Sequence, residues 1–169
     1  MKKIILGLLI FGLTTQFYAQ VVDEGMLPEV EVRAMNYKYL NSVDNTAAPV
    51  PVKLLEREVA NYNIMESDLY SDQYDTYEVS FYIPEGRIVA VYDDKGKLIR
   101  TIEKFQNIKV PKEISKSVAK RFPGFIISKD TYKVSYHRDG GVSIQEYKLT
   151  LKNGDKLLKV KTDPKGKFI

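Results

Sequence analysis

Apolar and polar residues alternate over residues 28–40, and this is the first regular pattern in the chain. Val30 and Val32 fall on the same side of an extended segment, as expected for a half-buried β-strand with its period of two. Residues 41–51 contain Asn, Asp, Ala and two prolines, and this composition favours a loop. The sequence therefore predicts an N-terminal strand and loop within residues 20–49.

A spacing of three and four residues follows Pro51, and this spacing is typical of an amphipathic helix. We predict the helix over residues 52–62, with Pro51 suited to its first turn. Its apolar stripe consists of Val52, Leu55, Val59 and Tyr62. The acidic and polar residues 63–76 predict a loop.

From Thr76 onward the period of two returns, which predicts a run of β-strands. In the first of them, Phe81 lies on the more apolar side, whereas Tyr82 lies on the other side with Glu78 and Ser80 and faces solvent or a partner. The predicted strands are 77–83, 87–92, 97–104, 126–137, 142–152, 155–162 and a last short strand at 166–169.

A second helix is predicted to begin at Pro111, because apolar residues again recur at helical spacing. Its stripe consists of Ile114, Val118 and Phe122, and Pro123-Gly124 ends it. The dipeptide Asn153-Gly154 is a strong signal for a β-hairpin between the strands on either side of it.

Residues 77–99 resemble residues 147–169 without a gap, at an offset of 70. Identical residues occur at Tyr77/Tyr147, Asp93/Asp163, Lys95/Lys165, Gly96/Gly166, Lys97/Lys167 and Ile99/Ile169. Each copy is preceded by a predicted helix that begins at a Val-Pro dipeptide. The alternative is that the similarity reflects only common hairpin chemistry.

These patterns predict an α+β fold with two tandem helix-plus-antiparallel-sheet repeats, preceded by the N-terminal strand. An antiparallel sheet has one apolar face, and a helix laid across that face buries it. We expect the first repeat at 50–108 and the second at 109–169.

Residues 1–19 have the features of a secretory signal peptide. Lys2 and Lys3 are positive, residues 4–13 are apolar, and Ala19 offers a small residue before a cut. Ten apolar residues are too few for a membrane-spanning helix, which needs about 20. We therefore expect cleavage near Ala19 and a periplasmic or secreted protein without a transmembrane segment in the mature chain. The alternative is a retained hydrophobic anchor.

The charge and composition of the chain exclude several classes of function. The net charge is +4, and loss of Lys2 and Lys3 with the signal peptide reduces it to +2, which is too small an excess to indicate nucleic-acid binding. The chain has no Cys and one His, so it has no thiolate zinc site, thiol nucleophile, disulfide or paired-histidine metal motif. We expect no cofactor and no metal.

Several turn and helix-start motifs resemble those of the PepSY-like family, which is also described as β-lactamase-inhibitor-like. They are VYDDKGKLI at 91–99, VPKEI at 110–114, RFPG at 121–124, NGDK at 153–156 and DPKGK at 163–167. The resemblance covers 77–169 well and 50–76 weakly. It implies an exported envelope protein with helix-plus-sheet repeats and a non-catalytic role in binding or inhibiting another protein.

Candidate chemical groups each have a plainer interpretation. His137 is the only imidazole, and we expect it at an exposed strand end and not in a hydrolase site.

The acidic residues of the 63–76 loop lack the Asp-x-Asp-x-Asp-Gly spacing of a calcium loop, so a solvated loop is favoured over a weak calcium site. Lysines on the second helix suggest either a solvated face or a surface for anionic lipid or an acidic partner. These basic residues are Lys109, Lys112, Lys116, Lys120 and Arg121.

Tyrosines are the best candidates for contact with a partner, because tyrosine is enriched at interfaces. The chain has 12 of them. We expect partner contacts at Tyr70, Tyr74, Tyr82, Tyr92 and Tyr136. Tyr132 also lies on a predicted strand, and packing at the core edge is the alternative for each of these tyrosines. The expected function is an exported non-enzymatic module that binds or inhibits a protein such as a hydrolase. The alternative is a small-ligand carrier or sensor with a pocket between helix and sheet.

Overall fold

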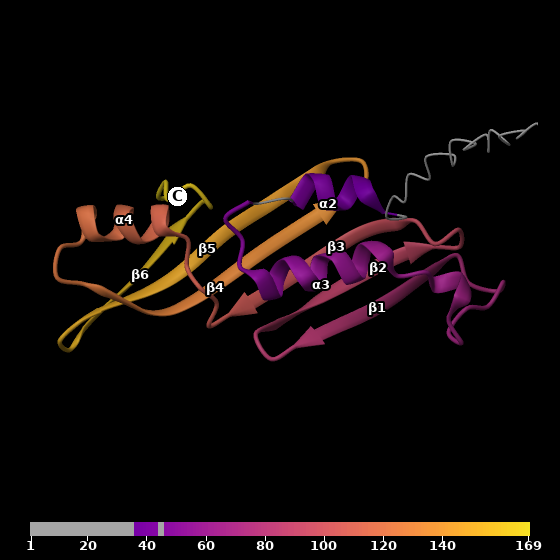
Figure 1. The fold of residues 1–169 in the computed structure, drawn as a ribbon, viewed down its shortest axis with the longest axis horizontal. Coiled ribbons are helices and arrows are strands. Elements are labelled where there is room, and N and C mark those ends of the chain that lie inside the picture. The colour runs from indigo at the N-terminus through magenta and orange to yellow at the C-terminus, as the bar shows by residue number, and fades with distance from the viewer. Residues whose placement is uncertain (1–35, 44–45) are drawn as a thin grey trace, which may run out of the picture. The chain divides into compact units, whose positions relative to one another are not determined.

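The structure is a computed structural model that describes residues 36–43 and 46–169, and these residues form an α+β fold (Figure 1). Six antiparallel strands follow one another across a single sheet in chain order. The strands are β1 (Thr76–Ile83), β2 (Gly86–Asp93), β3 (Leu98–Gln106), β4 (Ile126–His137), β5 (Gly141–Asn153) and β6 (Lys156–Thr162). The helices of the described residues are α2 (Tyr37–Val43), α3 (Val50–Asn61) and α4 (Lys112–Arg121), with the 3-10 turn η2 (Ile64–Glu66) after α3.

The six long strands predicted from the alternation are present, with bounds close to those expected. In β1 the side chains of Tyr77 and Phe81 are buried and that of Tyr82 is exposed, which confirms the predicted sides of this strand. The short strand expected at 166–169 is reduced to a single bridge between Thr162 and Phe168.

Both predicted helices are also present. Helix α3 begins after Pro49 and buries Val52, Leu55 and Val59, while α4 begins after Pro111 and buries Ile114 and Val118. The apolar stripe of each helix is therefore the side that contacts the rest of the molecule. Within the described residues, no helix is both long enough and apolar enough to cross a membrane.

The prediction of a strand over residues 28–40 is wrong for its C-terminal part, because Tyr37–Val43 forms α2. Tyr39 and Val43 are one helical turn apart and are both buried, so helical spacing and not alternation places the apolar side chains here. The rest of the predicted strand, 28–35, lies outside the described residues, as do residues 1–19.

The core lies between the helices and the sheet face that they cover. It is rich in aromatic side chains: Tyr132 stacks on Tyr147 with ring centroids 4.5 Å apart, and Tyr39 packs edge-on against Tyr136 at 5.2 Å. The Tyr92 hydroxyl donates to the carbonyl oxygen of Val59 at 2.9 Å, which attaches β2 to α3. Buried tyrosines thus supply apolar area to the core, and Tyr92 also uses its polar tip to bond to a helix.

The hairpins β1–β2 and β5–β6 share one register when compared at an offset of 70 residues. Tyr77 pairs with Tyr92, and Tyr147 pairs with Thr162. The bridge from Thr162 to Phe168 likewise matches the pairing of Tyr92 with Leu98.

The turns after these hairpins also form the same hydrogen bonds. Asp93 Oδ1 accepts from the backbone N–H groups of Lys95 and Lys97 at 3.0 and 2.8 Å. Asp163 Oδ1 accepts from the N–H groups of Lys165 and Lys167, both at 2.9 Å. Gly96 and Gly166 complete the turns with φ of 73° and 83°, a region that favours glycine.

Candidate binding surface

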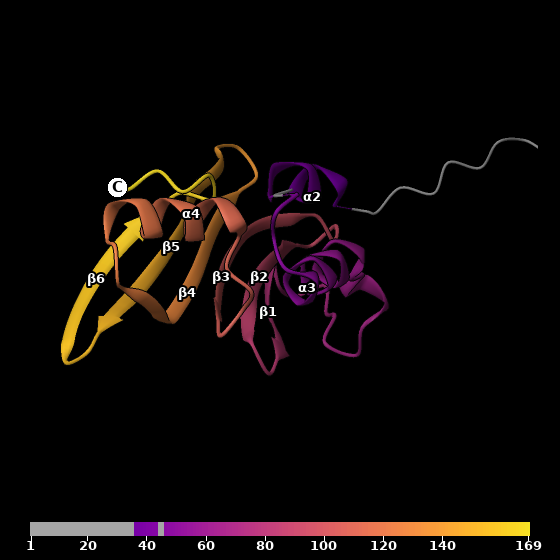
Figure 2. The same cartoon turned by 60° about the vertical axis from the view of Figure 1, so that its left-hand side comes forward.

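Helices cover one face of the sheet and leave the other face without a helix of the described residues (Figures 1 and 2). We call the uncovered side the open face. Alternation assigns each residue to a face: on β3, Glu103 and Phe105 are buried towards the helices, whereas Ile102 and Lys104 are exposed on the open face. An open face of this kind presents side chains from all six strands to solvent.

An apolar row crosses the middle of the open face. Val89 is opposite Ile102, Ile102 is opposite Ser135, and Ser135 is opposite Ile144. Ile102 is 55% exposed and Ile144 is 47% exposed. The two exposed isoleucines are in register on either side of Ser135 on β4, and they make a patch that a partner can desolvate.

A band of cations lies beside the apolar row. Arg87 is directly opposite Lys104, and Lys104 is directly opposite Lys133. Lys148 and Lys161 form a further direct pair on β5 and β6. We call the five residues Arg87, Lys104, Lys133, Lys148 and Lys161 the cation band.

Like charges affect one another within this band. The ammonium group of Lys148 is the main cause of a lowered pKa at Lys133, with smaller contributions from burial and from Lys104, while the carboxylate of Glu146 opposes the shift. Glu146 is directly opposite Lys133, and its carboxylate is also 3.4 Å from Lys148 Nζ and 3.5 Å from Lys161 Nζ. The band therefore carries more positive charge than its own carboxylate balances.

Three of the five tyrosines expected to contact a partner are accessible to different degrees. Tyr82 lies on the open face at the end of the row that contains Arg87, and it is 67% exposed. In the 63–76 loop, Tyr74 is 60% exposed, while Tyr70 is half-buried and stacks on Tyr77 at 5.7 Å. The loop and the open face thus present separate aromatic contacts.

The expectation that Tyr92 and Tyr136 are contact residues is wrong, because both side chains are buried. Their strands place them on the face that α2 and α3 cover, where Tyr92 bonds to Val59 and Tyr136 packs on Tyr39. Tyr132, on strand β4, is fully buried as well. Strand position alone did not reveal which face carries the helices.

A pocket of about 580 Å³ lies between the end of α4 and the helix-side face of β4–β6. The residues that line it include Arg121, Phe122, Asp130, Leu149, Val160 and Phe168. Arg121 Cζ lies 4.7 Å from the centre of the Phe168 ring, a cation–π contact. Burial raises the pKa of Asp130, and its carboxylate accepts from the N–H of Ile108 at 3.1 Å. The pocket wall thus combines apolar side chains with charged residues, which also include Lys129, Lys148, Lys159 and Lys161.

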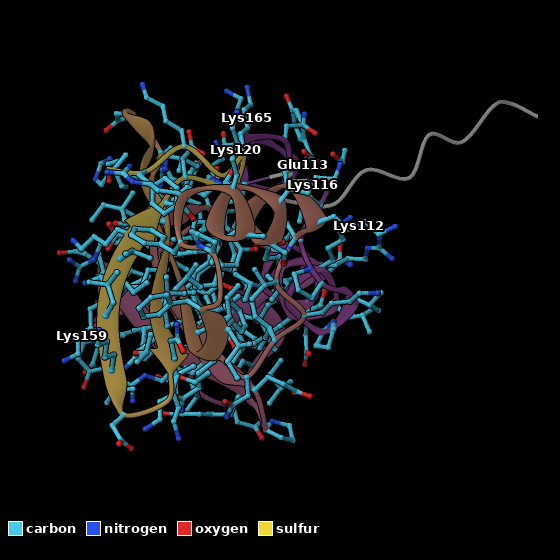
Figure 3. The ribbon with its side chains drawn as sticks, turned by 90° about the vertical axis from the view of Figure 1, so that its left-hand side faces the viewer. Lys112, Glu113, Lys116, Lys120, Lys159 and Lys165 are labelled. Carbon is cyan, nitrogen blue, oxygen red and sulfur yellow. The ribbon has the colours of Figure 1, made fainter. Side chains whose placement is uncertain are left out.

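The lysines of α4 project into solvent, and Lys165 lies near them, whereas Lys159 points away from β6 on another side of the molecule (Figure 3). Lys116 pairs with Glu113 at 2.8 Å. Arg121, expected on the same stripe, packs against aromatic rings instead. The α4 lysines therefore form a separate cationic surface from the cation band.

The acidic loop and His137 are both at the surface. Among the described residues, no three His, Cys, Asp or Glu side chains are grouped as metal ligands, so no grouping supports a calcium site in the loop. His137 ends β4 with its side chain 51% exposed. Its Nδ1 accepts from the N–H of Asp139 at 3.3 Å.

A buried carboxyl cluster, which the sequence did not indicate, joins α2, α3 and β3. Glu103 Oε1 accepts from the hydroxyls of Tyr39 and Thr101, each at 2.8 Å. Burial raises the pKa of Glu103 to about 7, although these hydrogen bonds and one with Glu56 oppose the rise. Burial also raises the pKa of Tyr39, with the carboxylates of Glu103 and Glu56 contributing. A hydrogen bond between two carboxyl groups requires a proton on one of them.

The cation band was missed for a different reason. Each of its members occupies an alternate, polar position of a predicted strand, which was visible in the sequence. Their juxtaposition depends on the strand order and register, which alternation within one strand does not report.

Comparisons of the chain with models of protein families, with curated proteins and with solved structures found no match.

Proposed function

We propose that the protein is an exported, non-enzymatic binding module that contacts a protein or peptide through the open face and the tyrosine loop at 63–76. The observation that carries this proposal is a sheet face, uncovered by any helix of the described residues, on which Tyr82, Ile102 and Ile144 are exposed. An apolar centre with charged residues around it is the usual anatomy of a protein interface. Restraint of a hydrolase is one form that such binding takes.

The non-enzymatic part of the proposal is supported by the surroundings of His137. The only imidazole of the chain lies at an exposed hairpin end, with Asp139 as its polar neighbour. A hydrolase activity that is lost on His137→Ala would contradict this part.

The exported part of the proposal is supported by Lys2, Lys3 and the apolar residues 4–13. Expression of the full chain in an export-competent bacterium should yield a product that begins near Gln20 in the periplasm or medium. N-terminal sequencing tests this. A full-length product retained with the membrane fraction favours the anchor instead.

We also propose that residues 77–99 and 147–169 are copies of one unit in two tandem helix-plus-sheet repeats, as the resemblance to the PepSY-like family implies. The identical register of the two hairpins and the matching hydrogen bonds of Asp93 and Asp163 support this proposal. Exchange of the turns 93–97 and 163–167 should leave the fold intact, which circular dichroism and thermal unfolding test. Loss of folding would argue that the two turns are not equivalent.

Site-specific photocrosslinking tests the binding function. A benzophenone amino acid at position 82 should capture a protein partner in the native compartment. The same amino acid at Leu54, which is 57% exposed on α3, is the matched control on the helix side. Equal capture at both positions, or none at position 82, would contradict use of the open face.

A small-ligand carrier or sensor is the second candidate, favoured by the pocket beside Arg121 and Phe168. Its apolar and mostly basic lining fits an amphipathic ligand. Native mass spectrometry of the protein purified from its own compartment should then show a bound small molecule that Leu149→Arg displaces. A ligand-free spectrum would remove this candidate.

A further inference from the structure

We infer that the partner docks a carboxylate-rich segment of its protein chain along the cation band. This inference rests on the proposed function and names the chemistry of the partner at the open face. The band crosses five neighbouring strands, from Arg87 on β2 to Lys161 on β6. Neighbouring strands are about 4.8 Å apart, so the band extends over roughly 19 Å.

The first argument is the direct opposition of like charges. Cations directly opposite each other on antiparallel strands are destabilising, yet Arg87, Lys104 and Lys133 form such a row. None of the three is within ion-pair distance of a carboxylate in the described part of the chain, although Glu146 is directly opposite Lys133. No carboxylate is directly opposite Arg87 or Lys104, and an external anion would relieve the repulsion between these two cations.

The second argument is the kind of anion that the band already holds. The carboxylate of Glu146 lies between the ammonium groups of Lys148 and Lys161. Glu146 is also directly opposite Lys133, so one carboxylate serves the band from β4 to β6, while Arg87 and Lys104 have no carboxylate opposite them. A partner that supplies aspartate or glutamate side chains to Arg87 and Lys104 would continue the same arrangement.

The third argument concerns the surface next to the band. The adjacent row consists of Val89, Ile102, Ser135 and Ile144, so the partner meets apolar groups beside the cations. A peptide provides both kinds of side chain. Single-stranded nucleic acid needs stacking platforms for successive bases, and the band has Tyr82 only at its end. An acidic protein segment therefore fits this face better than nucleic acid.

The experiment uses the full mature chain and a fluorescent synthetic peptide that alternates glutamate with valine. We expect saturable binding that weakens as salt is raised, because exposed charges are screened. The same peptide with glutamine in place of glutamate should bind much more weakly. The variant Lys104→Glu/Lys133→Glu should lose roughly tenfold or more of the affinity, since attraction becomes repulsion at the centre of the band.

The matched control is Lys112→Glu/Lys116→Glu, which makes the same change of net charge on the exposed surface of α4. It should leave the affinity within about twofold, because α4 lies on the other side of the sheet and its effect at that range is screened. Thermal unfolding of each variant verifies that the fold is retained. Equal loss in both double variants would overturn the inference, since net charge alone would then explain binding.

Three other probes complete the test: heparin, a single-stranded oligonucleotide and vesicles of anionic lipid. Tighter binding of any of them than of the acidic peptide would overturn the inference, as would self-association that occupies the band. If Ile102→Ser abolishes capture of the crosslinked partner but Lys104→Glu/Lys133→Glu does not, the proposed function stands and this inference fails. If neither variant changes the capture, this inference fails, and the comparison of positions 82 and 54 alone decides the proposed function.

Discussion

The hydroxyl of Tyr39 donates to Glu103 Oε1 across 2.8 Å, and this bond ties helix α2 to strand β3. Both side chains are almost completely buried. Thr101 donates to the same oxygen, and Glu56 reaches the cluster from α3. Two consecutive helices and a strand distant in sequence thus meet at one buried carboxyl group.

This cluster makes stability depend on pH. Glu103 has a pKa of about 7 in the folded protein against 4.5 for an ordinary glutamate, so the folded state holds a proton that the unfolded state has released. The free energy of unfolding should therefore fall as pH rises from about 4.5 to 7, by up to about 3 kcal/mol from this group alone. Urea unfolding at a series of pH values measures it.

The variant Glu103→Gln provides the control for this dependence. Glutamine keeps the shape of the side chain and cannot ionise, so its stability should change much less between pH 4.5 and 7. Equal slopes for the wild type and Glu103→Gln would show that another group is responsible.

Loss of the Tyr39 hydroxyl should weaken the attachment of α2. Tyr39→Phe keeps the ring contact with Tyr136 and removes one hydrogen bond to a buried carboxyl group, which costs about 1–3 kcal/mol. Tyr74→Phe, at an exposed loop position, should be neutral in the same thermal unfolding assay. A neutral Tyr39→Phe would mean that water or Glu56 replaces the lost donor.

The backbone conformation at position 166 and the atoms that surround it both require glycine. Its φ is +83°, and a Cβ atom there would lie 2.7 Å from Ser117 Oγ and 2.8 Å from the carbonyl oxygen of Glu113 on α4. Gly166→Ala should cost about 1–3 kcal/mol, because strain and overlap add. Gly140→Ala is the control, since nothing lies within 4 Å of its Cβ position. Similar melting temperatures for both variants would contradict the contact of α4 with this turn.

Removal of one charge from the cation band should stabilise the fold. Lys104 lies directly between Arg87 and Lys133, so Lys104→Gln relieves repulsion on both sides and should add about 0.2–1 kcal/mol. Lys112→Gln on α4 should have no such effect. Urea unfolding of both variants measures this difference, and a loss of stability in Lys104→Gln would argue against uncompensated charge in the band. The same change should weaken binding of the acidic peptide.

The local elements were predictable because their signals are local. Alternation along β1, helical spacing in α3 and α4, and turn residues such as Gly96 each depend on neighbours in the chain. Helix α2 was not predicted because its seven residues fit both the alternation of a strand and the spacing of a helix. Only the burial of Tyr39 against Tyr136 distinguishes the two structures.

By itself, the sequence determined the α+β class, the positions along the chain of the six strands and of helices α3 and α4, and the side of β1 on which Tyr82 lies. Only the tertiary structure decided which face of each strand is covered. On β3 it buries Glu103 and exposes Ile102, the reverse of their polarity, because Tyr39 and Thr101 satisfy the carboxyl group while Phe105 fills the same face. It also decided that Lys104 and Lys133 are neighbours, since register is a property of two strands and not of one.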